Sequence, residues 1–420
     1  MIMRKILENI LLNQAKKIIA RHKPVIIAVT GSFGKTATKD AIFAVLDDKS
    51  TVRQSIKNYN NELGVPLTVI GEEAPGSSLM NWLSLLLAGR RALSDENYPK
   101  TLILEMAADR PGDLQKLVNV ALPKISIVTA VGPVHLEYFL TEENIAKEKA
   151  TLVKVLPQDG TAILNGDDEK VDKMHELTKA KVMTYGFGEN NDIRGADIQR
   201  KADGVGFSFK IHYDGKVIPS ETDHLLAEYQ IYSLLAAFAA AIALGKNPLD
   251  AAKRLTEFNP PPGRLKVLPG IKNTIIIDDT YNASPIAVRG AITVLKQAYP
   301  KARTWAVLGD MMELGGDSQN MHEEIGKHVF KTGIDYLVAV GERSKGSARA
   351  ALQTGMNEDK IFRFEKPEDA GKFLEDEIIP GDVLLVKGSQ GARMEKIVKE
   401  LMANPLDAPM LLVRQGKGWE

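Results

Sequence analysis

Cysteine is absent from the 420-residue sequence. Its absence excludes disulfide bonds, thiol catalysis and thiolate metal ligands, so oxygen or nitrogen atoms must hold any metal. Net charge is absent too, because 54 Lys and Arg residues balance 54 Asp and Glu residues. Such a chain has no general attraction for polyanions, so we expect no nucleic-acid partner. A reducing compartment suits a cysteine-free chain, and we expect a cytoplasmic protein.

Long apolar runs are scarce. Residues 1–23 mix isoleucines with basic residues and contain no uninterrupted apolar core, which predicts an amphipathic helix rather than a signal peptide. The apolar segment 79–87, followed by Arg90 and Arg91, is too short to span a bilayer. We expect both segments to pack on the protein, and peripheral contact with a membrane surface stays open as the alternative.

Length and composition predict a globular chain of two domains. The apolar share of 44% and the charged share of 26% are ordinary values, and 420 residues exceed one ordinary core. The run Asn-Pro-Pro-Pro-Gly at 259–263 can continue neither a helix nor a central strand, so it marks a hinge. We predict an N-terminal helix over 1–24, a central domain over 25–259 and a C-terminal domain over 260–420, in a monomer.

A phosphate-binding turn organises the central domain. Residues 25–30 are apolar and β-branched, as in a buried parallel strand, and a glycine-rich turn then leads into a helical pattern. Backbone N–H groups and the helix N-terminus would hold the phosphates of ATP, a lysine would neutralise them, and a threonine would ligate Mg²⁺. The residues are Gly31, Ser32, Gly34, Lys35 and Thr36. The alternative is a glycine-rich connector without a ligand.

Polar residues follow the next predicted strands of the central domain. The strand 101–105 ends on Glu105, and His135 lies just beyond the strand 125–129. A helix from Glu142 then carries Lys149. Ligands gather at the carboxyl ends of parallel strands, so these residues predict a metal site. Taken singly, each could equally be a structural or solvent-facing residue.

The C-terminal domain predicts a second parallel sheet. Segments 274–279, 304–309, 336–341 and 383–387 read as strands separated by helices, a doubly wound α/β pattern. Asp279, Asp310 and Lys387 fall at the ligand-facing ends of three of them. Between residues 160 and 218, short alternating runs predict small, partly antiparallel strands added to the first sheet. The fold class is therefore α/β: a P-loop central domain with a mostly parallel sheet and a Rossmann-like C-terminal domain.

The motifs together resemble one family, the Mur ligases, and are most similar to its MurF type, which adds D-alanyl-D-alanine. The resemblance spans about residues 25–396, nearly the whole chain, and the combination is more specific than any one block. The blocks are GSFGKTATK (31–39), NYNNELGVP (58–66), Glu105, GPVHLE (132–137), NIAKEK (144–149), Gly263-Arg264, DDTYNASP (278–285), LGDMMEL (308–314) and KGSQGARMEK (387–396).

The resemblance implies a reaction. ATP phosphorylates the carboxylate of a muramoyl-peptide acceptor, and a D-alanyl-D-alanine-like amine attacks the acyl phosphate to give an amide, ADP and phosphate. It implies two Mg²⁺ ions, with Lys35, His135 and Lys149 as catalytic residues and Lys149 carbamylated. The implied metal ligands are Thr36, Glu105, His135 and Lys149. Phosphoryl transfer needs chiefly positioning and charge neutralisation, which such residues supply.

The resemblance also implies contacts from other parts of the chain. Implied nucleotide contacts are Asn61, Arg264, Asp279 and Asn282, the last three reaching the nucleotide when the C-terminal domain closes about the hinge at Pro260. Implied substrate contacts are Asp310, Glu313, Lys387 and Ser389. Closure would exclude water that could hydrolyse an acyl phosphate.

Two alternatives stay open. MurF-type enzymes carry an N-terminal domain that binds the uridine diphosphate, whereas 24 residues precede the cradle here, so we expect a chain without that domain. One alternative is therefore a related ligase with a different amine or with an acceptor that lacks UDP, including a lipid-linked one. The other is a non-catalytic nucleotide-binding scaffold for cell-wall synthesis.

Overall fold

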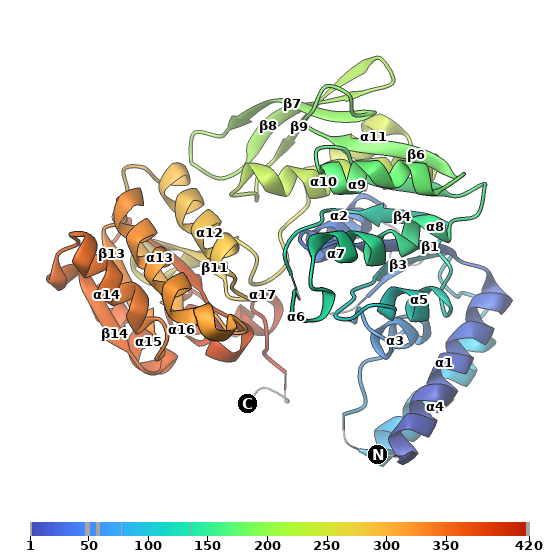
Figure 1. The fold of residues 1–420 in the computed structure, drawn as a ribbon, viewed down its shortest axis with the longest axis horizontal. Helices are drawn as coiled ribbons and strands as arrows, with labels where there is room; N and C mark the ends of the chain where they lie inside the picture. The colour runs from blue at the N-terminus through green and yellow to red at the C-terminus, as the bar shows by residue number, and fades with distance from the viewer. Residues whose placement is uncertain (1, 47–50, 56–58, 77, 135, 417–420) are drawn as a thin grey trace. The chain divides into compact units, whose positions relative to one another are not determined.

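The computed structural model describes residues 2–46, 51–55, 59–76, 78–134 and 136–416 (Figure 1). The chain forms two compact units. Unit 1 comprises Met1–Gln199, Phe207–Asp223 and Glu228–Phe258. Unit 2 comprises Arg200–Gly206, His224–Ala227 and Asn259–Glu420, so two short segments that precede residue 259 fold with the C-terminal unit.

Unit 1 is built on a nine-stranded sheet of order β2-β3-β1-β4-β5-β6-β7-β8-β9. The central strand β1 pairs in parallel with β3 and with β4. Partly antiparallel strands were expected after residue 160. The expectation is confirmed, because β5 and β6 extend the parallel sheet while β8 and β9 form an antiparallel pair. The strands are β1 (Val25–Thr30), β2 (Val52–Gln54), β3 (Thr101–Glu105), β4 (Ile125–Val128), β5 (Thr161–Asn165), β6 (Lys181–Gly186), β7 (Ile193–Arg200), β8 (Phe207–Tyr213) and β9 (Lys216–Thr222).

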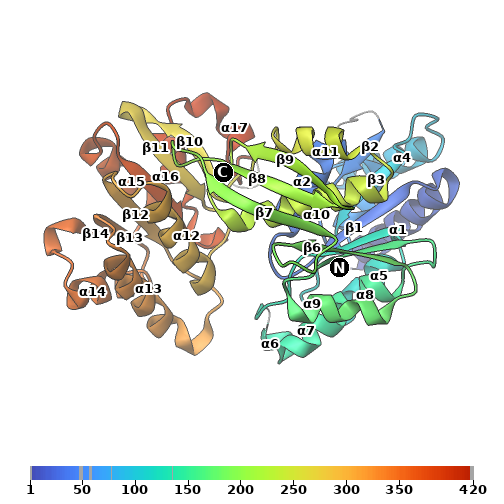
Figure 2. The same ribbon diagram turned by 90° about the horizontal axis from the view of Figure 1, so that it is seen from above.

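Helices cover both faces of this sheet, as its mostly apolar and buried central strands require. Ile26 and Ala28 of β1 share one core with Leu11 and Ala15 of α1. Helices α2 and α10 pack against each other and against the other face (Figure 2). The helices are α1 (Ile2–His22), α2 (Lys35–Leu46), α3 (Gly64–Ile70), α4 (Leu79–Leu93), α5 (Asp113–Val118), α6 (Leu136–Phe139), α7 (Glu142–Lys149), α8 (Thr151–Lys154), α9 (Glu169–Asp172), α10 (Ile231–Ala243) and α11 (Pro248–Leu255).

Unit 2 has a six-stranded sheet of order β10-β11-β15-β12-β13-β14, parallel except for the edge strand β10. Alternate residues of β12 enter two cores: Ala306 packs with α12, α13 and α14, and Val307 with α15 and α16. The strands are β10 (Lys266–Gly270), β11 (Thr274–Asp279), β12 (Thr304–Gly309), β13 (Tyr336–Val340), β14 (Ile361–Phe364) and β15 (Val383–Lys387). The helices are α12 (Pro285–Ala298), α13 (Ser318–Thr332), α14 (Lys345–Thr354), α15 (Pro367–Glu377), α16 (Glu395–Leu401) and α17 (Ala408–Leu411). The predicted α/β class and the doubly wound second sheet are confirmed.

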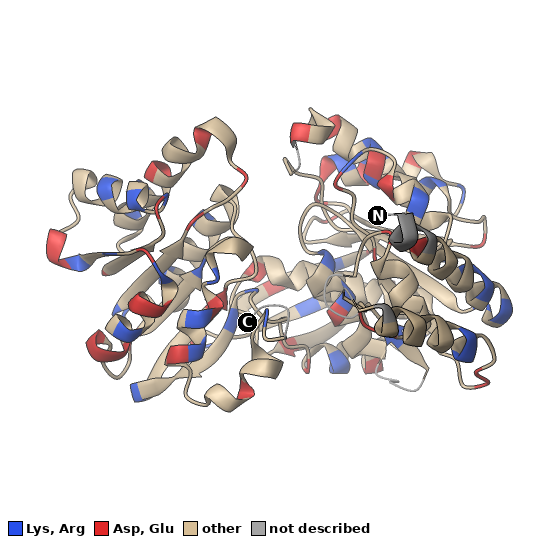
Figure 3. Ribbon diagram, turned by 90° about the horizontal axis from the view of Figure 1, so that it is seen from below, with Lys and Arg blue, Asp and Glu red and all other residues tan. Residues whose placement is uncertain are grey.

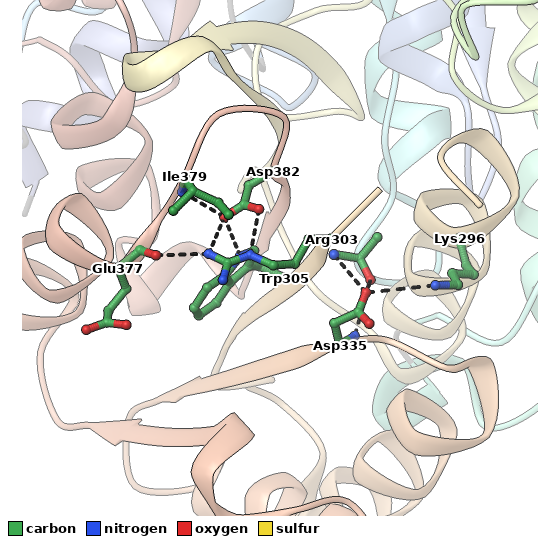
Figure 4. A network of polar contacts seen from close by, with 8 residues as sticks. Lys296, Arg303, Trp305, Asp335, Glu377, Ile379 and Asp382 are labelled. Carbon is green, nitrogen blue, oxygen red and sulfur yellow. Dashed lines mark hydrogen bonds and ion pairs between the residues drawn. The ribbon is translucent and has the colours of Figure 1, made fainter. Parts of the chain in front are cut away.

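A polar network ties the amino-terminal ends of the unit 2 strands together (Figure 4). The guanidinium of Arg303 binds both carboxylate oxygens of the buried Asp382, at 2.7 Å each. Asp382 also accepts hydrogen bonds from the indole of Trp305 (3.0 Å) and from the backbone of Ile379 (3.1 Å). The network lies at the edge opposite to the predicted site, so its role is to hold the sheet.

Candidate nucleotide and metal site

The turn after β1 has the backbone of a phosphate cradle. Gly31 and Gly34 adopt φ values of 152° and 80°, which side chains disfavour. A Cβ on Gly31 would lie 1.9 Å from Oγ1 of Thr129, so only glycine fits at that position. The Thr129 hydroxyl in turn donates to the carbonyl oxygens of Thr30 and Phe33. The loop after β4 therefore supports the cradle from outside.

Ser32 and Lys35 are held by the same loops. The Ser32 hydroxyl accepts the Gly132 N–H at 3.0 Å, and the Ser32 N–H donates to Ala130 O at 2.8 Å. The Lys35 amine donates to Gly31 O at 2.6 Å, within the concave turn. A bound phosphate would replace the Gly31 carbonyl as the partner of the Lys35 amine. Lys35 itself lies at the start of α2, where the sequence predicts it.

Glu105 meets Thr36 at the carboxyl edge of the sheet. Strand β3 lies beside β1, with Glu105 opposite Val29, so its side chain reaches the start of α2. The carboxylate is only 2% exposed and accepts the Thr36 hydroxyl at 2.9 Å. Its other oxygen accepts the Asn60 amide at 3.0 Å. Two predicted metal ligands thus come together, and the described residues bonded to this buried carboxylate are both neutral.

The two neighbouring asparagines, Asn60 and Asn61, do different things. The sequence singled out Asn61, but its side-chain oxygen accepts the N–H groups of Leu63 (3.2 Å) and Gly64 (3.0 Å) at the start of α3. Asn60 is the asparagine that reaches Glu105. The sequence carries no signal that separates them, because the loop conformation decides which amide points toward the sheet. Asn58, in the same motif, lies outside the described residues.

Lys149 is a buried amine beside the cradle. It ends α7, is 4% exposed and has its pKa lowered to about 7, first by burial and then by the positive charge of Lys35. The neighbouring Glu148 raises that pKa but is itself bound to two backbone N–H groups, of Gly112 and Leu114, at 2.8 Å each. At neutral pH a large share of Lys149 is therefore uncharged and nucleophilic.

The Glu105 carboxylate and the Thr36 hydroxyl fit a magnesium ion, and one predicted ligand lies outside the described residues. Within the described residues, no three His, Asp or Glu side chains gather as a metal site. The predicted ligand His135 lies outside those residues. The buried Glu105 carboxylate beside the Thr36 hydroxyl still offers the oxygen donors that Mg²⁺ prefers.

A second cluster forms at the carboxyl edge of unit 2, where β11, β15 and β12 are neighbours. Lys387 at the end of β15 donates to the Asp279 carboxylate at 2.6 Å and to Asn282 O at 2.9 Å. Burial raises the pKa of Asp279, and Lys387 opposes that shift. Lys387 is thus used to hold the loop that follows β11. Asp278 accepts N–H groups from Gly263 and Thr280, and burial raises its pKa to about 6.

The remaining predicted residues of unit 2 divide by exposure. The Ser389 hydroxyl donates to Ala283 O (3.3 Å) and accepts the Met312 N–H (2.8 Å), and the Asp310 carboxylate accepts the Ser344 N–H (2.8 Å). Both side chains are buried and serve loop geometry. Asn282 and Glu313 are exposed, and the Arg264 guanidinium lies 4.1 Å from the centre of the Tyr281 ring.

Arg414 is a residue that sequence reasoning missed. Its guanidinium donates to the carbonyl oxygens of Thr280 and Tyr281, and it pairs with the buried Glu395 at 2.9 Å. It therefore fixes the loop of the DDTYNASP block from a distant part of the chain. No local pattern could reveal it, because the contact spans more than 130 residues.

The fold and the cradle define a class, the P-loop α/β proteins. The family profile described as Mur ligase middle domain matches residues 29–241, and the one described as Mur ligase, glutamate ligase domain matches residues 263–390. Because the first alone covers half of the sequence, the chain belongs to the Mur ligase family.

Two curated relatives carry the same name. The UDP-N-acetylmuramoyl-tripeptide–D-alanyl-D-alanine ligase of Bacillus subtilis (strain 168) is 30% identical over 381 residues, which cover 91% of this chain and 76% of that protein. The Escherichia coli (strain K12) protein of the same name is 28% identical, covering 90% and 77%. Among solved structures, MurF of Acinetobacter baumannii has a TM-score of 0.78 at 25% identity, covering 93% of this chain and 79% of that chain. MurF of Thermotoga maritima, in complex with ADP, has a TM-score of 0.75 at 26% identity, covering 94% and 83%.

Proposed function

We propose that this chain is an ATP-dependent ligase that joins D-alanyl-D-alanine, or a similar amine, to the carboxylate of a muramoyl peptide in peptidoglycan precursor synthesis. The observation that carries the proposal is the joint presence of the cradle, the buried Glu105–Thr36 pair and the buried amine of Lys149 at one sheet edge. The names of the relatives supply the two substrates.

The proposed reaction has two steps, phosphoryl transfer and amide formation. A carboxylate oxygen of the acceptor attacks the γ-phosphorus of ATP, the bond from that phosphorus to the bridging oxygen breaks, and ADP leaves. The amine nitrogen then attacks the acyl carbon, phosphate leaves with the carboxylate oxygen, and the nitrogen loses a proton. The N–H groups around Gly31 and Gly34 and the amine of Lys35 hold the phosphates and offset their charge.

Magnesium would be held by Thr36, Glu105 and a carbamylated Lys149, with His135 as the predicted ligand of a second ion. When bound, it neutralises the charge on the transferring phosphoryl group. Carbamylation joins the neutral Lys149 amine to carbon dioxide with release of one proton, which turns a cation into an oxygen ligand. The lowered pKa of Lys149 supports this step, since only the neutral amine reacts.

The unit 2 residues have separate proposed roles. Arg264, Asp279 and Asn282 are proposed to contact the nucleotide. The proposed substrate contacts are Asp310, Glu313, Lys387 and Ser389. Three of these, Asp310, Lys387 and Ser389, also hold the loops around them through hydrogen bonds. The Lys387–Asp279 ion pair at 2.6 Å supports a fixed loop.

Phosphate release over a panel of acceptors and amines tests the proposal. Turnover should need ATP, a muramoyl-tripeptide and D-alanyl-D-alanine together. Acceptors with and without the UDP group, and lipid-linked acceptors, distinguish the related ligases.

Lys35→Ala should lower turnover by about a hundredfold or more, because a charge that stabilises the transition state is lost. Lys147→Ala, an exposed lysine on α7, is the matched control and should retain full activity. Absence of amine-dependent ADP formation with every pair would contradict the proposal and favour a non-catalytic scaffold.

A further inference from the structure

Helices α1 and α4 form a fixed pair on unit 1, lying side by side (Figure 1). The Gln14 amide donates to Leu86 O at 3.0 Å, and Nε2 of His22 lies 2.9 Å from Ala92 O. From the first contact to the second, the residue number increases in both helices, so the helices run parallel. A Cβ on Gly89 would lie 2.4 Å from the Gln14 side chain, so the helices approach closely. Their outward faces therefore keep a constant relation to each other.

Helix α4 has an apolar side that nothing covers among the described residues. Trp82, only 6% exposed, lies with Leu85 and Ala88 on the buried side. Met80, Leu83 and Leu87 are 77%, 51% and 56% exposed and follow one another at helical spacing. We call these three residues the apolar stripe. The buried Trp82 is not part of it.

Basic residues continue the same side of the pair. Arg90 and Arg91 follow the apolar stripe at the next helical positions and are exposed. Because the helices are parallel, the exposed Lys17 and Arg21 of α1 lie alongside this end. We call these four residues the basic end. Helix α4 has no acidic residue, and the charges of this face are visible in Figure 3. Asp95 and Glu96 lie in the turn beyond α4, and Asp95 and Glu72 line a hollow together with Arg91.

We propose that this face docks the protein on the surface of an anionic phospholipid membrane. Exposed leucines beside a cluster of cations are the interfacial pattern: apolar side chains enter the acyl boundary while cations meet the headgroups. The excess of cations at the basic end is complementary to a negative lipid surface. Attachment is peripheral, because no helix in the described residues is long and apolar enough to cross a bilayer. The inference does not depend on the ligase reaction.

Co-sedimentation of the full chain with vesicles tests the proposal. Binding is compared between vesicles of phosphatidylcholine alone and vesicles that also contain phosphatidylglycerol, at low and high salt. The protein should bind the anionic vesicles, and salt should weaken binding. The double variant Leu83→Ser, Leu87→Ser should lose about tenfold or more in affinity, because two apolar side chains that would enter the acyl boundary are removed. Lys17→Gln with Arg90→Gln should lose about tenfold or more as well, since each surface cation contributes separately.

Matched control variants distinguish docking through this face from nonspecific adsorption to vesicles. Leu406 and Met410 are 88% and 74% exposed on unit 2, so Leu406→Ser with Met410→Ser should leave binding unchanged. Lys216→Gln with Lys246→Gln controls for charge elsewhere. Thermal unfolding midpoints check that each variant folds. If the leucine variant does not fold, the charge variant still tests the face.

Three results would overturn the proposal. One is failure of the unaltered protein to bind anionic vesicles. Another is equal binding to neutral vesicles at all salt concentrations, which would remove the role of the cations. The third is a loss of binding in the control variants that matches the loss in the face variants. If light scattering instead shows a dimer that the leucine variant breaks and vesicles are not bound, the face joins two copies of the chain.

Discussion

Among single residues, Lys149 is a lysine held in a buried environment. Its amine is buried, it lies near the charge of Lys35, and its pKa falls to about 7. The unfolded chain, with a lysine pKa of about 10.4, binds more protons than the folded chain between pH 7 and 10. The contribution of Lys149 to folding stability therefore rises with pH across that window and is lowest below pH 7.

Carbamylation of Lys149 should be detectable directly. In buffer with ¹³C-bicarbonate, the protein should show one carbamate carbon resonance whose intensity rises through about pH 7, as the amine loses its proton. Lys149→Gln should remove the resonance, and Lys147→Gln on the same helix should keep it. A spectrum without that resonance at pH 8, or one that survives Lys149→Gln, would contradict the assignment.

Replacing the buried amine should also change stability. In carbonate-free buffer, Lys149→Met should raise the free energy of unfolding at pH 6 by about 2–4 kcal/mol, because a costly buried cation is removed. The gain should shrink toward pH 10, where the unfolded lysine is also neutral. Urea unfolding at the two pH values measures it, and a gain that does not depend on pH would argue against the lowered pKa.

Asn60 and Asn61 give a second test at the residue scale. Asn60→Ala should raise the magnesium concentration needed for half-maximal turnover by about tenfold, since Glu105 loses a hydrogen bond that orients it. Asn61→Ala should leave that dependence intact and cost about 1 kcal/mol of stability, because the turn into α3 loses its acceptor. Magnesium titrations of activity together with urea unfolding distinguish the two, and the reverse pattern would support the nucleotide role predicted for Asn61.

Among the elements, the sheet of unit 2 is tied at its amino-terminal edge by Asp382. Replacing the buried Asp382 by Asn removes the negative charge beside Arg303 and puts an NH2 donor where one carboxylate oxygen accepted from the guanidinium. Asp382→Asn should therefore lower the free energy of unfolding by about 3 kcal/mol. Glu368→Gln breaks the exposed pair with Lys396 and should cost under about 1 kcal/mol. Urea unfolding compares them, and equal effects would show that Asp382 does not hold the sheet.

The elements were predictable where their pattern is local. The central strands β1 and β3 and four strands of unit 2 follow from apolar runs that end in glycine or in charge. Strand β10 was missed because Pro269 interrupts it, and an antiparallel edge strand tolerates a proline. Strand β14 was missed because its four residues include Arg363. Arg414 and the contact from Asn60 depend on chain folding over long distances, which spacing in the sequence does not encode.

At the scale of the whole molecule, each unit gathers its predicted residues at the carboxyl edge of its own parallel sheet. Unit 1 brings Thr36 to Glu105, and unit 2 brings Lys387 to Asp279. Parallel strands create such an edge whatever the sequence between them. The order of the strands and of the motifs therefore predicted which residues lie together at each edge. The proposed substrates come from the names of the relatives.

The central claim is that the acceptor carboxylate is activated by transfer of a phosphoryl group. An acceptor labelled with ¹⁸O in its carboxylate, turned over with ATP and D-alanyl-D-alanine, tests it by mass spectrometry of the released phosphate. The account predicts one ¹⁸O atom in each phosphate for each amide formed. Amide formation with unlabelled phosphate would contradict it.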